Sequence, residues 1–507
     1  MTRLVVVGNG MVGARFVEDL LAADRTGRYR VTVLGAEACE PYNRVLLSEV
    51  VAGRYGVSTL TLPSPANDRL VVHRGVPATA IDREDRAVVT ADGSRHRYDQ
   101  LVLATGSSAR IPPLAGLAGA PGDLPRGVHP LRTIDDAREI VAATLNARRA
   151  VVLGAGVLGL EAASGLTQRG CEVTVVHPAA GLMERQLDAG ASRVVESAMA
   201  GLGIDHRIGV GAEAVLVEDG ALRGVRLGDG EVLGAELLVL ATGTTPNASL
   251  AAAAGLPTDR GVLVDAALAS VGDRRVFAVG DCAQPPEGGT GLVAQGWEQS
   301  RRLAATLCGA GPSPAPGPGG GNDVVRLKAH GLDVVTMGVC GSRREDDPAQ
   351  RTLRLSDPDE GRHVEVVVSG GVLVGATCVG AGQVAADLVA AYTRRSPVPA
   401  DPAYLLLTAL APSPHAAADP AAMPDHATVC RCNGVSKGDI AACVHDGAAS
   451  VEDVARATRA TTGCGGCADD VCALIRTTTA SHEAQPSGEN RLTKGKQMIH
   501  STETAAG

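Results

Sequence analysis

The sequence predicts an α/β fold: a tandem Rossmann-like pair of dinucleotide-binding domains, a small α+β domain and a small helical module. The apolar runs Leu4–Val7 and Ala150–Leu153 predict the tandem pair, because each leads into Gly-x-Gly-x-x-Gly and then a helical pattern. The 63 glycines among 507 residues are typical of the tight strand–helix turns of such folds. Two close pairs of cysteines after residue 428 predict the separate module.

The two glycine loops predict two dinucleotide sites. A glycine-rich turn alone is weak evidence, but here both the preceding strand and the following helix are present, as the fingerprint requires. Such glycines let the backbone approach a pyrophosphate at the N-terminus of a helix, where free N–H groups and the helix dipole favour an anion. The expected contact residues are Gly8, Gly10 and Gly13 in the first loop and Gly154, Gly156 and Gly159 in the second.

The residue at the end of the second strand in each unit indicates how the ribose of the nucleotide is held. In the first unit, Val31–Leu34 is followed by Glu37, whose carboxylate is expected to hold a ribose 2′-hydroxyl. In the second unit, the strand Glu172–Val176 ends at His177, where an acidic residue would indicate NAD. Neither that acid nor an arginine cluster for a 2′-phosphate is evident, so NADH and NADPH both stay open.

Residues 320–410 predict a different domain, with short strands followed by a helix. The expected strands are Val324–Leu327, Leu332–Val335, His363–Val368 and Val372–Gly375, and the expected helix is Gln383–Arg394. A Gly/Pro-rich linker, Gly309–Gly321, precedes this region, and a Pro/Ala-rich stretch, about Ala411–Pro424, follows it. After about Ser481 the chain is polar and aperiodic, which predicts a disordered tail.

Two further segments favour a flavin in the first domain. These are Tyr98–Gly106 and Val276–Asp281. Together with the first glycine loop, they resemble the two-dinucleotide-fold flavoprotein reductases. The resemblance implies FAD in the first domain and NAD(P)H in the second, and it assigns Asp281 of the Gly280–Asp281 pair to the flavin ribitol. Taken alone, Asp281 is equally well a turn or cap aspartate.

The same resemblance implies further cofactor-binding residues. Glu161, just inside the second helix, is expected on the nicotinamide side; its structural alternative is a carboxylate favoured by the helix dipole. Arg44, Thr105 and Gly106 complete the expected set. No catalytic acid, base or nucleophile is expected, because the cofactors carry the redox chemistry.

Disulfide-reductase chemistry is the alternative for the first domain, and it needs a redox cysteine beside the flavin. Cys39 is the one candidate there, because no second cysteine follows it within residues 1–115, and the adjacent Glu40 disfavours a thiolate. The interpretation of Cys39 as catalytic is therefore the weaker one.

The C-terminal cysteines carry the strongest local signal. Cys430-x-Cys432 and Cys464-x-x-Cys467 supply four thiolates, which suit soft metals. The segment of about 428–475 resembles the bacterioferritin-associated ferredoxin type of module, which implies a [2Fe–2S] cluster with all four cysteines as ligands. Zinc is the alternative, although its knuckles more often have wider gaps. The remaining cysteines are expected to be packing residues, Cys443 and Cys472 among them.

Residues 1–475 as a whole resemble the N-terminal part of bacterial NAD(P)H-dependent nitrite reductase large subunits and the electron-transfer subunit of assimilatory nitrate reductase. The strings that carry this resemblance are Gly8–Met11, Tyr42–Ser48, Leu182–Asp188 and Lys328–Val334. A full nitrite reductase continues into a sirohaem domain with further cysteines, whereas no cysteine follows Cys472 here. The chain alone is therefore not expected to reduce nitrite by the family mechanism.

The resemblance implies a path from NAD(P)H through FAD and the [2Fe–2S] cluster to a separate nitrate- or nitrite-reducing protein. Two alternatives remain: a stand-alone NAD(P)H oxidase or ferredoxin-type reductase, and a redox-sensing or iron-handling module. The net charge of −9 without a long basic run argues against nucleic acid. Neither a signal peptide nor an apolar stretch of about 18 residues is evident, so a cytoplasmic protein is expected.

These expectations divide the chain into five parts. The predicted parts are an FAD-binding domain of residues 1–115 with 245–310, an NAD(P)H-binding domain of 116–244, an α+β domain of 322–410, a [2Fe–2S] domain of 425–478, and a disordered tail of 481–507.

Overall fold

A computed structural model of the chain describes residues 1–117, 124–311, 323–343, 347–407, 423–430, 433–463 and 466–483. Backbone proximity divides the chain into a larger unit, residues 1–416 with 462–465, and a smaller unit, residues 417–461 with 466–507. Most of the Gly309–Gly321 linker and of the Ala411–Pro424 stretch lies outside the described residues.

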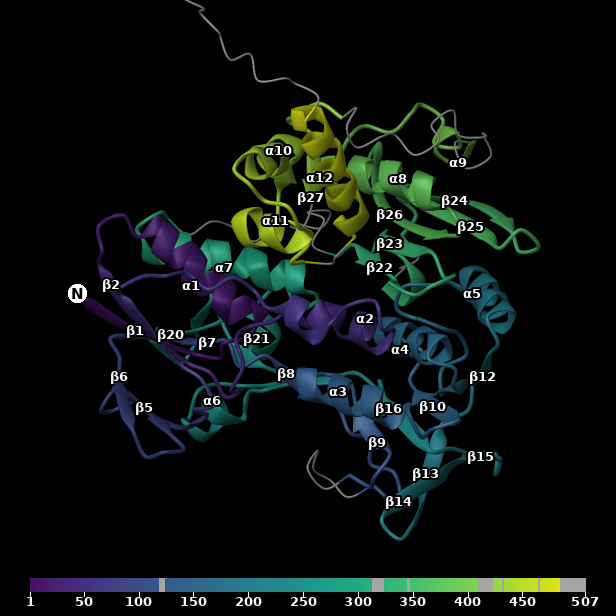
Figure 1. Cartoon of the computed structure of the whole chain (residues 1–507), viewed down its shortest axis with the longest axis horizontal. Coiled ribbons are helices and arrows are strands. Elements are labelled where there is room, and N and C mark those ends of the chain that lie inside the picture. Colours follow the sequence, from purple (N-terminus) through teal and green to yellow (C-terminus); the bar gives the residue numbers. More distant parts are fainter. Residues whose placement is uncertain are drawn as a thin grey trace, which may run out of the picture. The chain divides into compact units, whose positions relative to one another are not determined.

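The first sheet of the larger unit has six strands in the order β19-β20-β7-β1-β2-β3. Strands β20, β7, β1, β2 and β3 run parallel, and β19 is antiparallel to β20. Helices α1 (Met11–Ala23) and α7 (Val293–Leu307) lie side by side against it (Figure 1). The strands are β1 (Thr2–Val7), β2 (Tyr29–Leu34), β3 (Leu70–His73), β7 (Gln100–Leu103), β19 (Ala269–Ser270) and β20 (Asp273–Ala278).

The second sheet is fully parallel, with five strands in the order β12-β11-β10-β16-β9. Its strands are β9 (Val128–Pro130), β10 (Arg149–Leu153), β11 (Glu172–His177), β12 (Ile204–Ile208) and β16 (Leu237–Leu240). Its helices are α3 (Ile134–Ala143), α4 (Val157–Gln168) and α5 (Ala189–Gly201). Both sheets bury near-continuous Val/Leu runs, as parallel strands covered on both faces require. The predicted tandem α/β architecture is therefore confirmed.

Short strands, antiparallel except for the parallel pair β18 and β21, and two short helices accompany the two sheets. The connection between them is made by β8 (Ser107–Ala109) and β17 (Thr244–Pro246), which pair antiparallel. Helix α2 (Leu47–Val51) packs on α3 and α4 of the second sheet, and α6 (Ser249–Ala253) packs on β4. The remaining strands are β4 (Ala78–Asp82), β5 (Ala87–Thr90), β6 (Arg95–Arg97), β13 (Ala212–Glu218), β14 (Ala221–Leu227), β15 (Val232–Gly234), β18 (Val262–Leu263) and β21 (Ala283–Gln284).

A third sheet, antiparallel in the order β22-β23-β26-β25-β24, corresponds to the predicted α+β region. Its strands are β22 (Val325–Arg326), β23 (Val334–Gly338), β24 (Gln350–Asp357), β25 (Arg362–Ser369) and β26 (Val372–Val379). Helix α8 (Gly382–Arg394) packs on β23 and β26, and α9 (Tyr404–Leu407) packs on β24 and β25. Four strands and the helix were predicted, whereas β24 was missed because its exposed edge carries few apolar residues.

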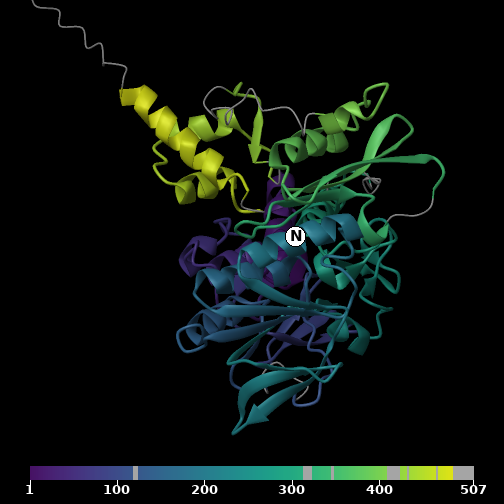
Figure 2. The same cartoon turned by 90° about the vertical axis from the view of Figure 1, so that its right-hand side faces the viewer.

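The smaller unit is helical, as predicted, and contains α10 (Lys437–His445), α11 (Val451–Thr458) and α12 (Ala468–Glu483), with the short strands β27 (Thr428–Cys430) and β28 (Val435–Ser436). Figure 2 shows α12 running beside α10, and their contact buries Ile440, Val471 and Leu474. Ser436 and Ser450 begin α10 and α11 with capping boxes, which satisfy free N–H groups. Helix α12 extends to Glu483, so the first residues of the expected tail are helical; the rest of that tail lies outside the described residues.

None of the described helices combines the length and the apolar character that crossing a bilayer demands.

Candidate functional site

The first glycine loop connects β1 to α1 and leaves room at only one of its three glycines. A Cβ on Gly8 would lie 2.1 Å from the carbonyl oxygen of Ala104, and one on Gly13 would lie 2.2 Å from that of Gly8. The nearest described atom to a Cβ on Gly10 is Arg44 Nε, 3.9 Å away. The outer glycines thus serve the fold, whereas Gly10 leaves open space at the start of α1.

The start of α1 is suited to an anion. Gly10 is the N-cap residue, and among the described side chains none caps the helix and none in its first turn is acidic. Free backbone N–H groups and the helix dipole therefore face the loop, which fits a pyrophosphate such as that of FAD.

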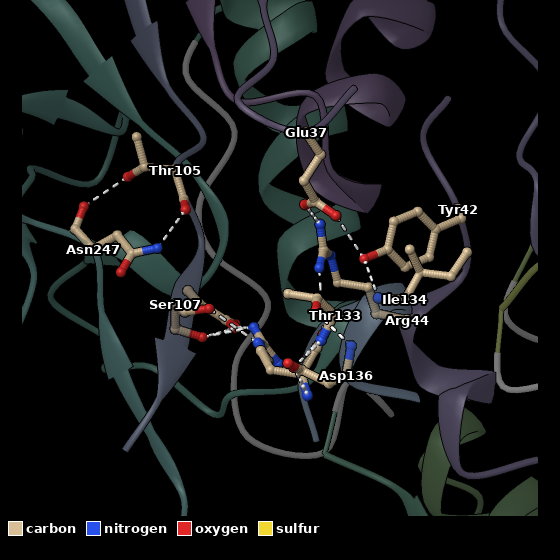
Figure 3. A network of polar contacts seen from close by, with 11 residues as sticks. Glu37, Tyr42, Arg44, Thr105, Ser107, Thr133, Ile134, Asp136 and Asn247 are labelled. Atoms are coloured by element: carbon tan, nitrogen blue, oxygen red, sulfur yellow. Dashed lines mark hydrogen bonds and ion pairs between the residues drawn. The ribbon is translucent and has the colours of Figure 1, made fainter. Parts of the chain in front are cut away.

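Glu37 and Arg44, both predicted to bind the cofactor, lie together just beyond the end of β2. The Glu37 carboxylate accepts hydrogen bonds from the Arg44 guanidinium and, at 2.7 Å, from the Tyr42 hydroxyl (Figure 3). Arg44 also lies over the Tyr42 ring, 4.6 Å from its centroid. The Tyr42 hydroxyl accepts from the backbone N–H of Ile134 at 2.9 Å, and burial raises the pKa of Tyr42. The carboxylate is therefore held in one place beside the glycine loop.

Asp281 lies in a short 3₁₀ turn, Gly280–Cys282, directly after β20. Its Oδ2 accepts from the Ser107 hydroxyl and from Arg132 Nη2, each at 2.7 Å. Arg132 also donates to the Ser107 carbonyl at 3.0 Å. Arg132 was not predicted to lie at the site. The sequence feature that could have indicated it is its position directly before Thr133, which begins α3 with a capping box.

Thr105 and Gly106 follow β7 at the same edge of the sheet. The Thr105 hydroxyl donates to the Asn247 carbonyl at 2.7 Å, and the Asn247 side-chain amide donates to the Thr105 carbonyl at 2.9 Å (Figure 3). Gly106 has φ +68°, which favours glycine. These bonds fasten the chain where it leaves and re-enters the first domain, next to Asp281.

The second glycine loop, between β10 and α4, repeats the first. A Cβ on Gly154 would lie 2.4 Å from the Ala241 carbonyl oxygen, and one on Gly159 would lie 1.9 Å from that of Gly154. At Gly156, the N-cap of α4, no described atom lies within 4 Å of the added Cβ. This loop therefore also fits a dinucleotide pyrophosphate.

Glu161 is buried inside α4 and makes three polar contacts with two residues from outside its own domain. Its Oε1 lies 2.7 Å from Lys328 Nζ and accepts from the Lys328 backbone N–H at 2.9 Å. Its Oε2 accepts from the Ser48 hydroxyl at 2.6 Å. Glu161 lies beyond the first turn of α4, so its carboxylate is stabilised by Ser48 on α2 and by Lys328 before β23 and not by the dipole of its own helix. Neither partner was predicted, although both lie in strings that carried the family resemblance.

Cys39 has the properties of a non-catalytic thiol. It is half-buried, and both its burial and the nearby Glu37 raise the pKa of its thiol. A raised pKa disfavours the thiolate that disulfide chemistry needs.

In the smaller unit, the structure describes two of the four predicted metal-ligating cysteines. Cys430 ends β27 and Cys467 precedes α12, and both are buried. The contact with Cys467 lowers the pKa of Cys430 to about 6, and Asn433, whose amide nitrogen lies 3.7 Å from Cys430 Sγ, also lowers it. Two adjoining buried thiols, one of them with a lowered pKa, are a donor set that fits an iron–sulfur cluster. Cys432 and Cys464 lie outside the described residues.

The fold and these sites define a flavoprotein reductase with two dinucleotide-binding domains. Residues 2–301 match the model of the pyridine nucleotide-disulphide oxidoreductase family, and the chain belongs to that family. Residues 428–477 match the BFD-like [2Fe-2S] binding domain. The chain is accordingly an FAD-dependent NAD(P)H oxidoreductase with a [2Fe–2S] domain, as the sequence predicted.

Two curated relatives extend along almost the whole chain. A nitrite reductase [NAD(P)H] of Bacillus subtilis (strain 168) is 32% identical over 94% of this chain and 58% of its own length. The assimilatory nitrate reductase electron transfer subunit of the same organism is 31% identical over 96% of this chain and 61% of its own length. The chain thus spans about three fifths of these relatives.

A solved structure has a similar fold over most of the chain. The covalent putidaredoxin reductase–putidaredoxin complex has a TM-score of 0.70 and 27% identity, and it covers 80% of this chain and 95% of the compared chain.

Proposed function

We propose that this chain is the electron-transfer component of a nitrate- or nitrite-assimilating system and delivers electrons from NAD(P)H to a separate catalytic protein. The proposal rests on the presence of two nucleotide-binding loops and a cysteine module in one chain. Two glycine loops are open at their middle glycines, Gly10 and Gly156, and the chain also has a cysteine module that matches a [2Fe-2S] binding domain. The relative named as an electron transfer subunit matches 96% of this chain.

We assign each cofactor to a part of the larger unit from the geometry of its loops. Residues 1–115 and 245–310 would hold FAD, with Gly10 at the pyrophosphate and Asp281 at the ribitol. Residues 116–244 would hold NAD(P)H at Gly156. When bound, FAD supplies hydride acceptance and the cluster supplies one-electron transfer. The chain's own residues bind and orient these groups, and Cys430, Cys432, Cys464 and Cys467 would ligate the cluster.

Reconstitution tests this proposal. Purified chain, NADH or NADPH, a molybdenum-containing nitrate reductase and nitrate should together produce nitrite, and omission of any component should abolish it. A sirohaem nitrite reductase is the alternative recipient. The Cys464→Ser variant should lose iron and nitrite production while keeping FAD and ferricyanide reduction. Cys472→Ser, which alters a half-buried thiol outside the ligand pattern, is the matched control and should keep both activities.

Three outcomes would contradict the proposal. Undiminished nitrite production by Cys464→Ser would exclude the cluster from the path. Stoichiometric zinc without iron after anaerobic purification would convert the module into a structural metal site. Rapid oxygen consumption without any partner would favour a stand-alone oxidase. We place the reaction in the cytoplasm, where NAD(P)H is available and thiols stay reduced.

A further inference from the structure

Strand β11 ends at His177, where many dinucleotide-binding domains place a carboxylate for the adenosine ribose. The His177 ring is buried, and its Nδ1 lies 3.3 Å from the backbone N–H of Ala155, within the second glycine loop. Because Nδ1 accepts that hydrogen bond, the neutral ring carries its proton on Nε2. Nε2 lies 3.0 Å from Glu184 Oε2 and therefore donates to it.

Glu184 is thus a carboxylate anchored at the carboxyl end of β11, although it lies seven residues further along the chain. Its backbone is held as well, because its carbonyl accepts from the Ser342 N–H at 3.0 Å. Its side chain is 47% exposed, so the carboxylate has room for a further partner. His177 and Glu184 together place a negative charge next to the loop that takes the pyrophosphate.

An open cleft of about 810 Å³ lies at the end of β12, the strand that pairs with β11. It is lined by residues 206–211 together with Gly228 and Asp229, at the carboxyl end of β12. β12 is the neighbour of β11, and the Gly209 N–H donates to the His177 carbonyl at 2.9 Å. The volume lies within the range of small-molecule sites. Its position beyond the carboxyl ends of adjacent parallel strands is where a Rossmann-like domain binds the adenosine half.

The charges around the cleft disfavour a 2′-phosphate. Arg207 lines the cleft, but its guanidinium is engaged by both carboxylate oxygens of Glu231, at 2.8 and 2.9 Å. Asp229 adds a further carboxyl group to the lining. A phosphate placed beside Glu184 would face like charge, whereas two ribose hydroxyls would each find an acceptor.

We infer that Glu184, held by His177, binds the 2′,3′-diol of the adenosine ribose and makes this chain prefer NADH to NADPH. The inference rests on the proposed assignment of NAD(P)H to the Gly156 loop. It deepens that assignment by supplying the acid that the end of β11 lacks. Arg185, adjacent and exposed, is the residue that would instead serve a 2′-phosphate.

Direct binding tests the inference without any electron acceptor. Calorimetry on the FAD-loaded full chain should show ADP-ribose binding at least tenfold more tightly than its 2′-phosphorylated form. Glu184→Gln should weaken ADP-ribose about tenfold, as expected for a lost hydrogen bond to a charged group, and should reduce the discrimination. Glu172→Gln, at the opposite end of β11, is the matched control and should change neither affinity.

A double variant distinguishes recognition of the ribose by a carboxylate from a purely structural role of the His177–Glu184 contact. His177→Asp combined with Glu184→Gln returns a carboxylate to the end of β11 and should recover most of the preference for ADP-ribose. Equal or tighter binding of the 2′-phosphorylated ligand by the unmodified chain would overturn the inference, as would unchanged discrimination in Glu184→Gln. If neither ligand binds, the NAD(P)H assignment of this loop fails together with the inference. Nitrite formation in reconstitution, by contrast, tests only the electron-transfer role.

Discussion

The two glycine loops are nearly the same in backbone and differ in what surrounds them. In both loops the first and third glycines press against a carbonyl oxygen, at Cβ distances of 2.1 and 2.2 Å in the first and 2.4 and 1.9 Å in the second. The middle glycine is free of such contact in both. Two of the three glycines in each loop are therefore required by strand–helix packing, while the middle one leaves the space that the proposed ligand needs.

The differences lie in the side chains at the carboxyl edge of each sheet. In the first domain, Glu37 is held by Arg44 and Tyr42. In the second, the equivalent strand ends in His177, whose ring contacts the Glu184 carboxylate. The same loop backbone can therefore serve two nucleotides because the distinguishing contacts come from other segments.

The largest expected effect is on stability, and it should distinguish a glycine that strand–helix packing requires from the middle glycine of the same loop. Gly159→Ala should destabilise the chain by several kcal/mol or prevent folding, because its Cβ would lie 1.9 Å from a backbone oxygen. Gly156→Ala should cost at most about 1 kcal/mol in the fold, because its Cβ meets open space. Denaturant unfolding monitored by circular dichroism measures both, and equal losses would contradict the proposed division of roles.

Substitutions of the two middle glycines should each weaken the binding of one nucleotide and not of the other. Gly10→Val should yield protein with little FAD, because the branched side chain occupies the pyrophosphate position. Gly156→Val should keep FAD and weaken ADP-ribose binding by tenfold or more. Flavin absorbance after gel filtration and calorimetry give the two readouts. Full FAD retention in Gly10→Val would refute the assignment of the first loop.

A smaller effect is expected from the Asp281–Arg132 pair, which has no described counterpart at the second loop. Asp281→Ala and Arg132→Ala should each weaken FAD retention, by about tenfold for the loss of a charge-assisted hydrogen bond. Arg138→Ala, on the exposed face of α3, is the control and should retain FAD fully. The FAD dissociation constant after flavin removal and reloading is the measurement. Unchanged affinity in both variants would limit the pair to a structural role.

The smallest expected effect concerns a feature that both sheets share. Arg3 of β1 pairs with Asp99 just before β7, and Arg149 of β10 pairs with Glu236 just before β16. In each pair the carboxylate also accepts the arginine's own backbone N–H. Hydrogen bonds from Arg3 lower the pKa of Asp99 to about 2, and the side chain of Arg149 lowers that of Glu236.

Asp99→Asn should therefore reduce stability at neutral pH by up to about 1 kcal/mol, the range of exposed pairs. A depressed carboxyl pKa stabilises the fold above the unfolded value, near 3.9, and this contribution is lost as the pH falls toward 2. The difference between variant and parent should accordingly shrink over that window in pH-dependent denaturant titrations. Glu236→Gln should change stability in the same direction, and a difference that grows with acid would refute the account.

Sequence and structure contributed differently to the third sheet and the smaller unit. Strand β25 and helix α8 were predicted to within one residue of their observed bounds. Strands β23 and β26 were predicted only in part, because both continue to more C-terminal residues than expected. β24 was missed, because an edge strand with one face in water lacks the apolar run that marks a buried strand. The cysteine pairs were recognisable because ligand spacing is a local property, although Cys432 and Cys464 lie outside the described residues.

The sequence by itself determined the tandem α/β fold, the two glycine loops and the cysteine module. These depend on backbone conformation and on residues a few positions apart, so short segments encode them. Only the tertiary structure decided which side chains meet at the sites. Arg132 reaches Asp281 across 149 positions and Lys328 reaches Glu161 across 167. Such contacts depend on how the sheets and helices pack, which no local pattern specifies.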